Sequence, residues 1–233
     1  MHSVAELPPW ERMLKSLVWA QLGEITGKQI LDFGSGEGIT ANHFADRNTV
    51  VAIEPDEKMR QNRWADHTYT QIAGDVSTLS AIKRESFDMI LCHNVLEYID
   101  DKAQTVSALC RLLKPGGTLS LVKHNRAGRV MQMAVLLDDA EQAHALLDGK
   151  DSVSARFGAI RYYEDEQIAQ WERRLQLIDL WGIRAFWHLQ QKQERHAAED
   201  WQAQMTRLEM RVSKIEEYRN IAFFHHLLFV KKE

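Results

Sequence analysis

A glycine-rich turn carries the clearest chemical signal in the sequence. Gly34, Gly36 and Gly38 follow the apolar run 29–33, and glycine lets the backbone turn sharply and lets a ligand approach more closely than a Cβ atom would allow. Glu54 ends the next apolar run, 18 residues after Gly36, which is where an acidic side chain accepts hydrogen bonds from a ribose. Together these features predict a ligand that contains a ribose.

The spacing of the glycines distinguishes between two classes of cofactor. Dinucleotide-binding turns usually read Gly-x-Gly-x-x-Gly, with the pyrophosphate on the N-terminus of the following helix. This chain reads Gly34-Ser35-Gly36-Glu37-Gly38 instead, and the negative charge of Glu37 would repel a diphosphate. The pattern therefore favours S-adenosylmethionine over NAD.

Three further segments extend this pattern: IAGDV at 72–76, FDMILCHNVLEY at 87–98 and LLKPGGTL at 112–119. In this order and spacing, across residues 29–122, they resemble the class I S-adenosylmethionine-dependent methyltransferases. The resemblance implies a cofactor site with Gly34, Ser35 and Gly36 under the methionine moiety, Glu54 and Pro55 at the ribose, Ala73, Gly74, Asp75 and Val76 around the adenine, and His93 facing the sulfonium.

Arg12 lies on a predicted helix ahead of the first strand. It is the candidate partner of the methionine carboxylate, because a guanidinium binds carboxylates through paired hydrogen bonds. A solvated surface position is the alternative, since surface arginines are common.

Beyond the cofactor half, the chain is similar to the bacterial enzymes that methylate the carboxyl group of 5-carboxymethoxyuridine at the tRNA wobble position. The similarity lies in residues 93–98, 119–125 and 182–186 and extends weakly through Leu208-Glu209 and His226. Lys123-His124 and Phe223-Phe224 depart from that subfamily's pattern, so we expect a changed substrate pocket.

The candidate substrate-binding residues are Lys123, Asn125 and Arg184. Lys123 begins a basic stretch that could meet an anionic substrate, or could form ordinary solvated surface. Arg184 interrupts an apolar strand, so it needs a carboxylate from the substrate or from a buried acid. No catalytic residue is assigned, because a carboxylate acceptor needs no general base; for a hydroxyl or ring nitrogen, His93, His124 or Glu97 could serve.

The elements that position these residues form a regular series. Apolar runs at 29–33, 50–54, 69–73, 87–93 and 118–123 alternate with helical stretches at 38–47, 57–65 and 102–113, which is typical of parallel strands joined by crossover helices. With two further strands at 180–189 and 221–230, we expect an α/β Rossmann-like, doubly wound, seven-stranded sheet. The resemblance implies that its last strand is antiparallel.

We expect residues 1–233 to form a single domain, with an N-terminal helix within 1–28, a cofactor half at 29–123 and substrate-side insertions at 124–163 and 190–220. The helical spacing predicts helices at 10–22, 129–147 and 164–178 and a long helix through 201–215. The first, second and fourth should extend toward the carboxyl edge of the sheet. If Lys123, Arg126, Arg129, Arg156 and Arg161 share a face there, RNA is favoured as the acceptor.

The amino-acid composition limits the classes of protein to which this chain can belong. Hydrophobic residues make up 45% and charged residues 27%, which excludes disordered, collagen-like and disulfide-stapled chains. The net charge of −4 gives no global reason to bind nucleic acid, and Cys92 and Cys110 suggest neither a metal site nor a disulfide framework.

We expect a cytoplasmic enzyme without a metal or a membrane segment; its oligomeric state is left open. tRNA is one expected partner and a small-molecule acceptor is the other. A methyltransferase-like module that binds nucleoside or RNA without turnover is the non-enzymatic alternative.

Overall fold

The computed structural model describes residues 2–154 and 157–232. Its strands are β1 Gln29–Phe33, β2 Thr49–Glu54, β3 Thr70–Ala73, β4 Phe87–His93, β5 Leu113–His124, β6 Ser152–Ser154, β7 Gly158–Ile160, β8 Leu175–Ile183 and β9 Phe224–Lys231. Its α-helices are α1 Pro9–Leu22, α2 Ile39–Ala45, α3 Glu57–Gln61, α4 Lys102–Leu112, α5 Arg126–Met131, α6 Ala140–Leu147, α7 Gln167–Trp171, α8 Glu199–Val212 and α9 Glu216–Arg219. The 3₁₀ helices are η1 Val4–Glu6, η2 Val76–Ala81, η3 Leu96–Tyr98, η5 Trp187–Leu189 and η6 Gln193–Ala197, and η4 Gln132–Leu136 is a π-helix.

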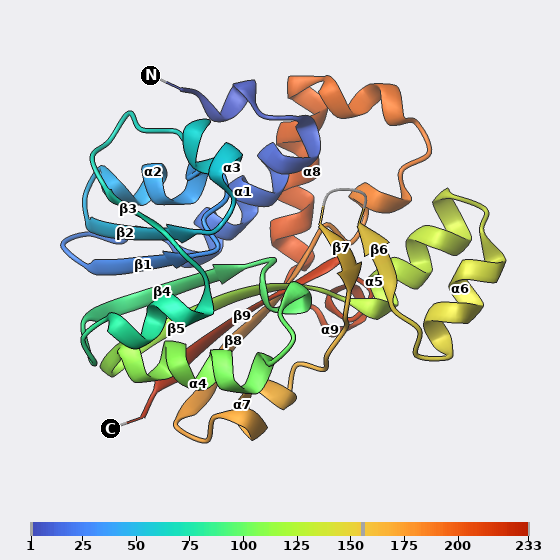
Figure 1. The fold of residues 1–233 in the computed structure, drawn as a ribbon. Coiled ribbons are helices and arrows are strands. Elements are labelled where there is room, and N and C mark those ends of the chain that lie inside the picture. Colours follow the sequence, from blue (N-terminus) through green and yellow to red (C-terminus); the bar gives the residue numbers. More distant parts are fainter. Residues whose placement is uncertain (1, 155–156, 233) are drawn as a thin grey trace.

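Seven of the strands in the described residues form one sheet, in the order β3-β2-β1-β4-β5-β9-β8 (Figure 1). Neighbouring strands are parallel from β3 to β5, and β9 is antiparallel to both β5 and β8. The predicted doubly wound sheet with an antiparallel last strand is confirmed.

Helices cover both faces of the sheet because its central strands are apolar on both sides. Ile30 and Leu31 of β1 and Ile90 and Leu91 of β4 are completely buried. On one face α4, α7 and η2 pack on the sheet, and on the other face lie α1, α2 and α8 (Figure 1). The cofactor half therefore has the two helical layers that its sequence predicts.

Helix α1 forms as predicted. It begins at Pro9, which is tolerated in the first turn because its missing N–H would have no partner there. Met13, Leu14, Leu17 and Val18 are buried on one face, where they pack with residues of β5, β8 and α8. The N-terminal segment is thus part of the core that supports the sheet.

The predicted helix at 164–178 is wrong. Only Gln167–Trp171 is helical, and β8 already begins at Leu175, ahead of the predicted strand at 180–189. The carboxylate of Glu172 accepts hydrogen bonds from the backbone N–H and guanidinium of Arg174, and the segment then pairs with β9. Sheet pairing overrides the helical spacing of the apolar residues.

Three other helices are shorter than predicted. The stretch 57–65 is helical only over Glu57–Gln61. The stretch 129–147 is divided into α5, η4 and α6, with Asp139 as the N-cap of α6. The long helix through 201–215 ends at Val212, and α9 follows separately. The β6–β7 hairpin has no counterpart in the sequence prediction, because each of its strands has three residues.

The carboxyl ends of the parallel strands face the α5–α6 segment and the β6–β7 hairpin (Figure 1). Ligands of doubly wound sheets bind at this edge. Among the helices described, none combines the length and the apolar character that crossing a membrane requires.

Candidate active site

The glycine turn has the close-packed backbone that a ligand cradle requires. Gly34 and Gly38 have φ angles of +74° and +68°, a region that favours glycine. A Cβ atom at Gly34 would lie 2.4 Å from Cγ2 of Val95, and one at Gly38 would lie 2.1 Å from the hydroxyl of Tyr69. The N–H groups of Gly34 and Ser35 donate to the carbonyl of Ile53, which fixes the turn against β2.

A cavity of about 430 Å³ opens above this turn at the carboxyl edge of the sheet. Its walls come from the first half of α1, the glycine turn, the ends of β2 and β4, the start of η2, η3 and Phe157. The structure brings together eight of the predicted cofactor residues here, namely Gly34, Ser35, Gly36, Glu54, Pro55, Asp75, Val76 and His93.

Glu54 is buried in the wall of this cavity, with 6% of its surface exposed. Its two carboxylate oxygens accept hydrogen bonds from the N–H groups of Gly36 at 2.8 Å and Asp56 at 2.9 Å. Because each oxygen can accept more than one hydrogen bond, the carboxylate is held in place and can still receive the hydroxyls of a ribose.

The predicted adenine segment divides into two parts. Asp75 and Val76 line the cavity, whereas Ala73 and Gly74 do not. Gly74 faces η2 instead, since a Cβ atom there would lie 2.0 Å from Oγ1 of Thr78. The hydrogen bonds from the hydroxyl and N–H of Ser77 lower the pKa of Asp75, so its carboxylate is ionised and caps η2.

His93 lies at the end of β4, and its ring is tied to the interior of the sheet. Its Nε2 lies 2.7 Å from Oγ of Ser120, which lies 2.9 Å from Nε2 of His226. Nδ1 of His226 is 2.8 Å from Oε1 of Gln21. Burial lowers the pKa of His93 well below its usual value and that of His226 to about 3, so both rings are neutral near pH 7.

Arg12 is not in the cavity wall, and its predicted role at the methionine carboxylate is not supported. Its guanidinium donates to the carbonyls of Ala5 and Leu7, because the η1 turn folds back over this side of α1. Lys15 lines the cavity in its place and donates to Oγ1 of Thr40 at 2.8 Å. Sequence reasoning missed Lys15, which lies one helical turn from Arg12; only the tertiary structure shows which of the two faces the cavity.

Lys15 also affects a buried acid next to the cavity. Burial raises the pKa of Asp32 to about 6, and the positive charge of Lys15 opposes that increase. One oxygen of Asp32 has no hydrogen-bond partner. The first turns of α1 therefore supply the positive charge of an otherwise acidic wall that includes Glu11, Glu37, Glu54 and Asp75.

Two predicted substrate residues make their contacts within the chain. Lys123 is buried, with 3% of its surface exposed, and its ammonium pairs with Asp165 at 2.8 Å. Asn125 is the N-cap of α5 and donates to the carbonyls of Asn220 and Ala222. Neither lines the cofactor cavity, because Lys123 is directed toward Asp165 and the ring of Tyr163, and the amide of Asn125 is held by the two carbonyls.

Arg184 differs from these two. It directly follows β8 with a φ of +61°, and it is 3% exposed. Its guanidinium donates to the carbonyl of Trp10 at 2.9 Å, while its Nε has no partner. Burial lowers its pKa to about 9, so it is a buried cation beside a residue of the cavity wall.

The candidate bases lie away from the cavity wall or are neutral. Glu97 is 1% exposed, and burial raises its pKa to about 7. His124 has a pKa of about 3, also because of burial. The residues described here hold no group of three or more His, Cys, Asp or Glu side chains arranged to bind a metal ion.

Comparison with known proteins agrees with this geometry. Residues 31–121 match the family described as "Methyltransferase domain". The chain is 24% identical to the Escherichia coli (strain K12) protein "tRNA 5-carboxymethoxyuridine methyltransferase", covering 93% of this chain and 87% of that protein. It is 30% identical to a Klebsiella pneumoniae "Ubiquinone biosynthesis O-methyltransferase" over 49% of this chain and 50% of that protein.

Solved structures share the fold. A putative S-adenosylmethionine dependent methyltransferase from Listeria monocytogenes superposes with a TM-score of 0.63 at 13% identity, covering 97% of each chain. A Burkholderia thailandensis 1,6-didemethyltoxoflavin-N1-methyltransferase with bound S-adenosylhomocysteine gives 0.56 at 14% identity, covering 98% of this chain and 80% of that chain.

Proposed function

We propose that this chain, which is a class I S-adenosylmethionine-dependent methyltransferase, transfers a methyl group to an oxygen nucleophile. The acceptor that we propose is the carboxylate of a modified wobble uridine in tRNA.

The observation that carries this proposal is the extent of the similarity. The match to the tRNA 5-carboxymethoxyuridine methyltransferase runs over 93% of this chain, including the segments after β5. The matches to ubiquinone biosynthesis O-methyltransferases run over 48–69% of it. Segments outside the shared cofactor half distinguish acceptors in a common fold, so the longer match favours the tRNA substrate.

The residues around the cavity support a carboxylate acceptor. When bound, S-adenosylmethionine supplies a methyl group on a sulfonium, and a carboxylate oxygen can receive it without losing a proton. The ring of His93 is neutral and hydrogen-bonded to Ser120, and Glu97 is outside the wall. The contribution of the chain would be to align the two reactants and to exclude water.

The proposed cofactor residues are the eight predicted ones that line the cavity, together with Lys15 at the methionine carboxylate. We also propose that residues 1–233 act as one domain. Its support is a single apolar cluster that joins α1, β5, β8 and α8 through Leu17, Val122, Ile183 and Trp201.

One observation favours the small-molecule alternative. The basic track that we expected beside the cleft is not formed as predicted: Lys123 is buried, Arg126 binds the carbonyls of Leu146 and Lys150, and Arg161 pairs with Asp100. Arg156 lies outside the described residues. A small carboxylic acid or another metabolite is therefore the second candidate acceptor.

Incubation of the purified protein with methyl-labelled S-adenosylmethionine and tRNA from cells lacking this protein tests the proposal. We expect label in a wobble nucleoside, released by mild alkali as a methyl ester should be. Label in a small acid of the same cell extract, with none in tRNA, would identify the alternative. Cofactor binding without any labelled product would indicate a non-catalytic module.

A further inference from the structure

Nitrogen-bearing side chains gather around His188 and the ring of Phe223, on which His188 stacks. They come from the end of β5, from α5, from the residue after β8, and from η5 and η6. We call them the nitrogen cluster: His124, Arg129, Arg184, His188 and His196. The ring of His188 stacks on Phe223 at 3.6 Å between centroids, and the guanidinium carbons of Arg184 and Arg129 lie 5.4 and 6.0 Å from the same ring centre.

Each member of the cluster has a buried nitrogen without a hydrogen-bond partner. These atoms are Nδ1 of His124, Nε of Arg129, Nε of Arg184, Nδ1 of His188 and Nε2 of His196. Buried polar atoms are normally satisfied, and each one left unpaired is costly. The two arginine Nε–H groups are donors that lack an acceptor among the described residues, and each histidine nitrogen can donate or accept according to its tautomer. A ligand with hydrogen-bonding groups would satisfy them.

The positive charge of the cluster favours an anionic group as its ligand. Within the described residues, the ion pairs of the structure give Arg129 and Arg184 no carboxylate partner. Glu209 is nearby, but its oxygens accept from the N–H groups of residues 185–187. Burial lowers the pKa of Arg184 and Arg129, and the negative charges of Glu209 and Glu11 offset part of that effect at Arg184. A buried cation without a paired carboxylate is costly.

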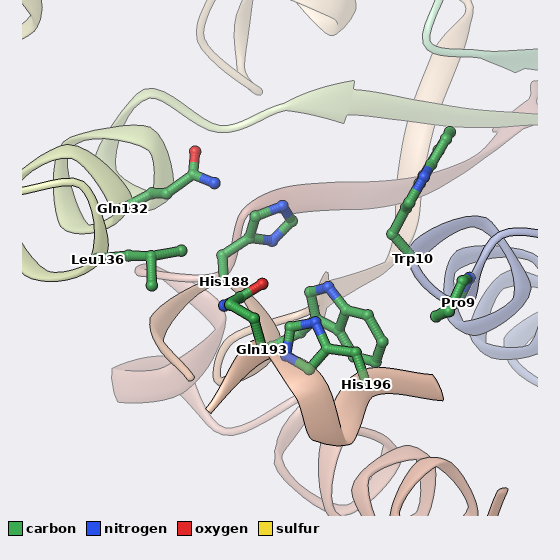
Figure 2. A pocket seen from close by; sticks show the side chains of 8 residues that line it. Pro9, Trp10, Gln132, Leu136, His188, Gln193 and His196 are labelled. Atoms are coloured by element: carbon green, nitrogen blue, oxygen red, sulfur yellow. The ribbon is translucent and has the colours of Figure 1, made fainter. Parts of the chain in front are cut away.

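A pocket of about 320 Å³ adjoins the cluster (Figure 2). His188 and His196 line it together with Trp10 and the side chain of Gln132, and the ring of His188 is directed into the space between Gln132 and Trp10. Trp10 also lines the cofactor cavity, and its carbonyl accepts a hydrogen bond from Arg184. The pocket, the cluster and the cofactor cavity therefore meet at Trp10.

The shape and chemistry of this pocket suit a planar ring. Trp10 is 47% exposed, and aromatic faces bind nucleobases by stacking. Neutral imidazoles can donate or accept a hydrogen bond, which matches the carbonyl and N–H groups of a pyrimidine. Arginine is the side chain best suited to a carboxylate.

We propose that this pocket is the acceptor subsite, in which a planar ring stacks near Trp10, His188 and His196 while Arg129 and Arg184 bind the carboxylate that the ring carries. This inference rests on the proposed function, because it assigns the position of the acceptor. It has a consequence for turnover: the ester product has no negative charge, so it loses the ionic contacts that hold the substrate.

The test compares the binding of an acid with that of its methyl ester in the presence of S-adenosylhomocysteine. Binding is measured by the change in tryptophan fluorescence. One probe pair is 5-carboxymethoxyuridine and its methyl ester. The other is phenoxyacetate and its methyl ester, which place the same carboxylate on a ring that is not a nucleobase. We expect each acid to bind about tenfold more tightly than its ester, as charge-assisted hydrogen bonds require.

Three variants complete the experiment. Arg184→Gln and Arg129→Gln should each reduce the acid preference to within about twofold. Arg126→Gln is the matched control, because Arg126 is on the same helix as Arg129 but packs on Tyr162 and is outside the cluster; its preference should be unchanged. Circular dichroism and S-adenosylhomocysteine affinity establish that each variant is folded, and Arg129→Gln alone decides the question if Arg184→Gln is unstable.

The outcomes separate this inference from the proposed function. No acid preference in either probe pair, or a preference that both cluster variants retain, would overturn the subsite. A third outcome supports the anion subsite and refutes the tRNA substrate. In it the protein prefers phenoxyacetate to its ester and the variants lose that preference, while the nucleoside acid is not preferred and tRNA carries no label.

Discussion

The cofactor cavity and the nitrogen cluster are neighbours, yet they differ in how the chain holds their ionisable side chains. In the cavity, Glu54 accepts from backbone N–H groups, Asp75 from Ser77 and His93 is bonded to Ser120. In the nitrogen cluster five buried nitrogens have no partner in the described residues. In the cavity wall the chain itself holds these acidic and imidazole groups, and Oγ of Ser35 and Oδ1 of Asn94 lack a partner within the described part of the chain. In the nitrogen cluster the atoms without a partner belong to arginine and histidine side chains.

This difference indicates how the two sites are specified. A cavity whose groups are already held in place binds its ligand with little reorganisation, and so with little loss of conformational freedom. A cluster that holds two arginines without a paired carboxylate among the described residues disfavours a ligand that cannot supply negative charge or hydrogen-bond acceptors. Cofactor binding is thus expected to depend on backbone shape, and acceptor choice on charge.

The largest expected effect follows from closing the glycine turn. In Gly34→Ala the new Cβ atom would meet Val95 at 2.4 Å, in a backbone with a φ of +74°. Strain of about 1–3 kcal/mol together with the clash should weaken S-adenosylmethionine binding about 100-fold, as measured by calorimetric titration. Gly116→Ala is the control, since Gly116 has a φ of +73° and open space around it. Equal affinities of the two variants would contradict a shape-determined cavity.

The second-largest expected effect on cofactor binding comes from removing the Glu54 carboxylate. Glu54→Ala removes an acceptor from the proposed ribose site and leaves the N–H of Gly36 without its partner. We expect a cost of about 1.5–3 kcal/mol, or at least about a tenfold increase in the Kd of S-adenosylmethionine. The exposed Glu57→Gln variant should bind as the parent does. An unchanged Kd in folded Glu54→Ala would remove Glu54 from the site.

Lys15 and Arg12 offer a comparison within one helix. Lys15→Met should raise the KM for S-adenosylmethionine about fivefold to tenfold, because it removes a cation from the cavity wall. Arg12→Met should leave that KM within about twofold of the parent value, because its guanidinium binds backbone carbonyls. The reverse order of effects would restore Arg12 as the carboxylate partner.

The smallest effect concerns stability and pH. Burial lowers the pKa of His226 to about 3, whereas a histidine in an unfolded chain has a pKa of about 6.5. From about pH 7.5 to pH 5.5 only the unfolded chain takes up this proton, so the folded state loses about 1.4 kcal/mol. His226→Gln should remove that part of the loss, as measured by urea unfolding.

The control for this measurement is His144→Gln, because His144 is exposed on α6 and its variant should retain the pH dependence of the parent. Glu97 and Asp32, whose pKa values burial raises to about 7 and 6, change stability in the opposite direction over this range. They are present in parent and variant alike, so the difference isolates His226. A parent-like slope in His226→Gln would show that the ring is not held neutral.

The cofactor half was predictable from the order of its residues, because the signals that place it are local. A parallel strand, its turn and the following helix form one continuous segment, so the glycines after β1, Glu54 at the end of β2 and His93 at the end of β4 could be placed from the chain alone. Strand ends of a parallel sheet meet at one edge. Their meeting in one cavity therefore followed from chain order.

The features outside the cofactor half depend on tertiary packing. Local residue spacing does not show in which direction a side chain points or which distant strands pair. Residues 175–178 have apolar residues compatible with a helix, but pairing with β9 makes them a strand. Lys15 rather than Arg12 faces the cavity, and Lys123 is directed toward Asp165. The nitrogen cluster brings residues from separate elements, between positions 124 and 196, together around His188 and Phe223. Only packing could bring them together.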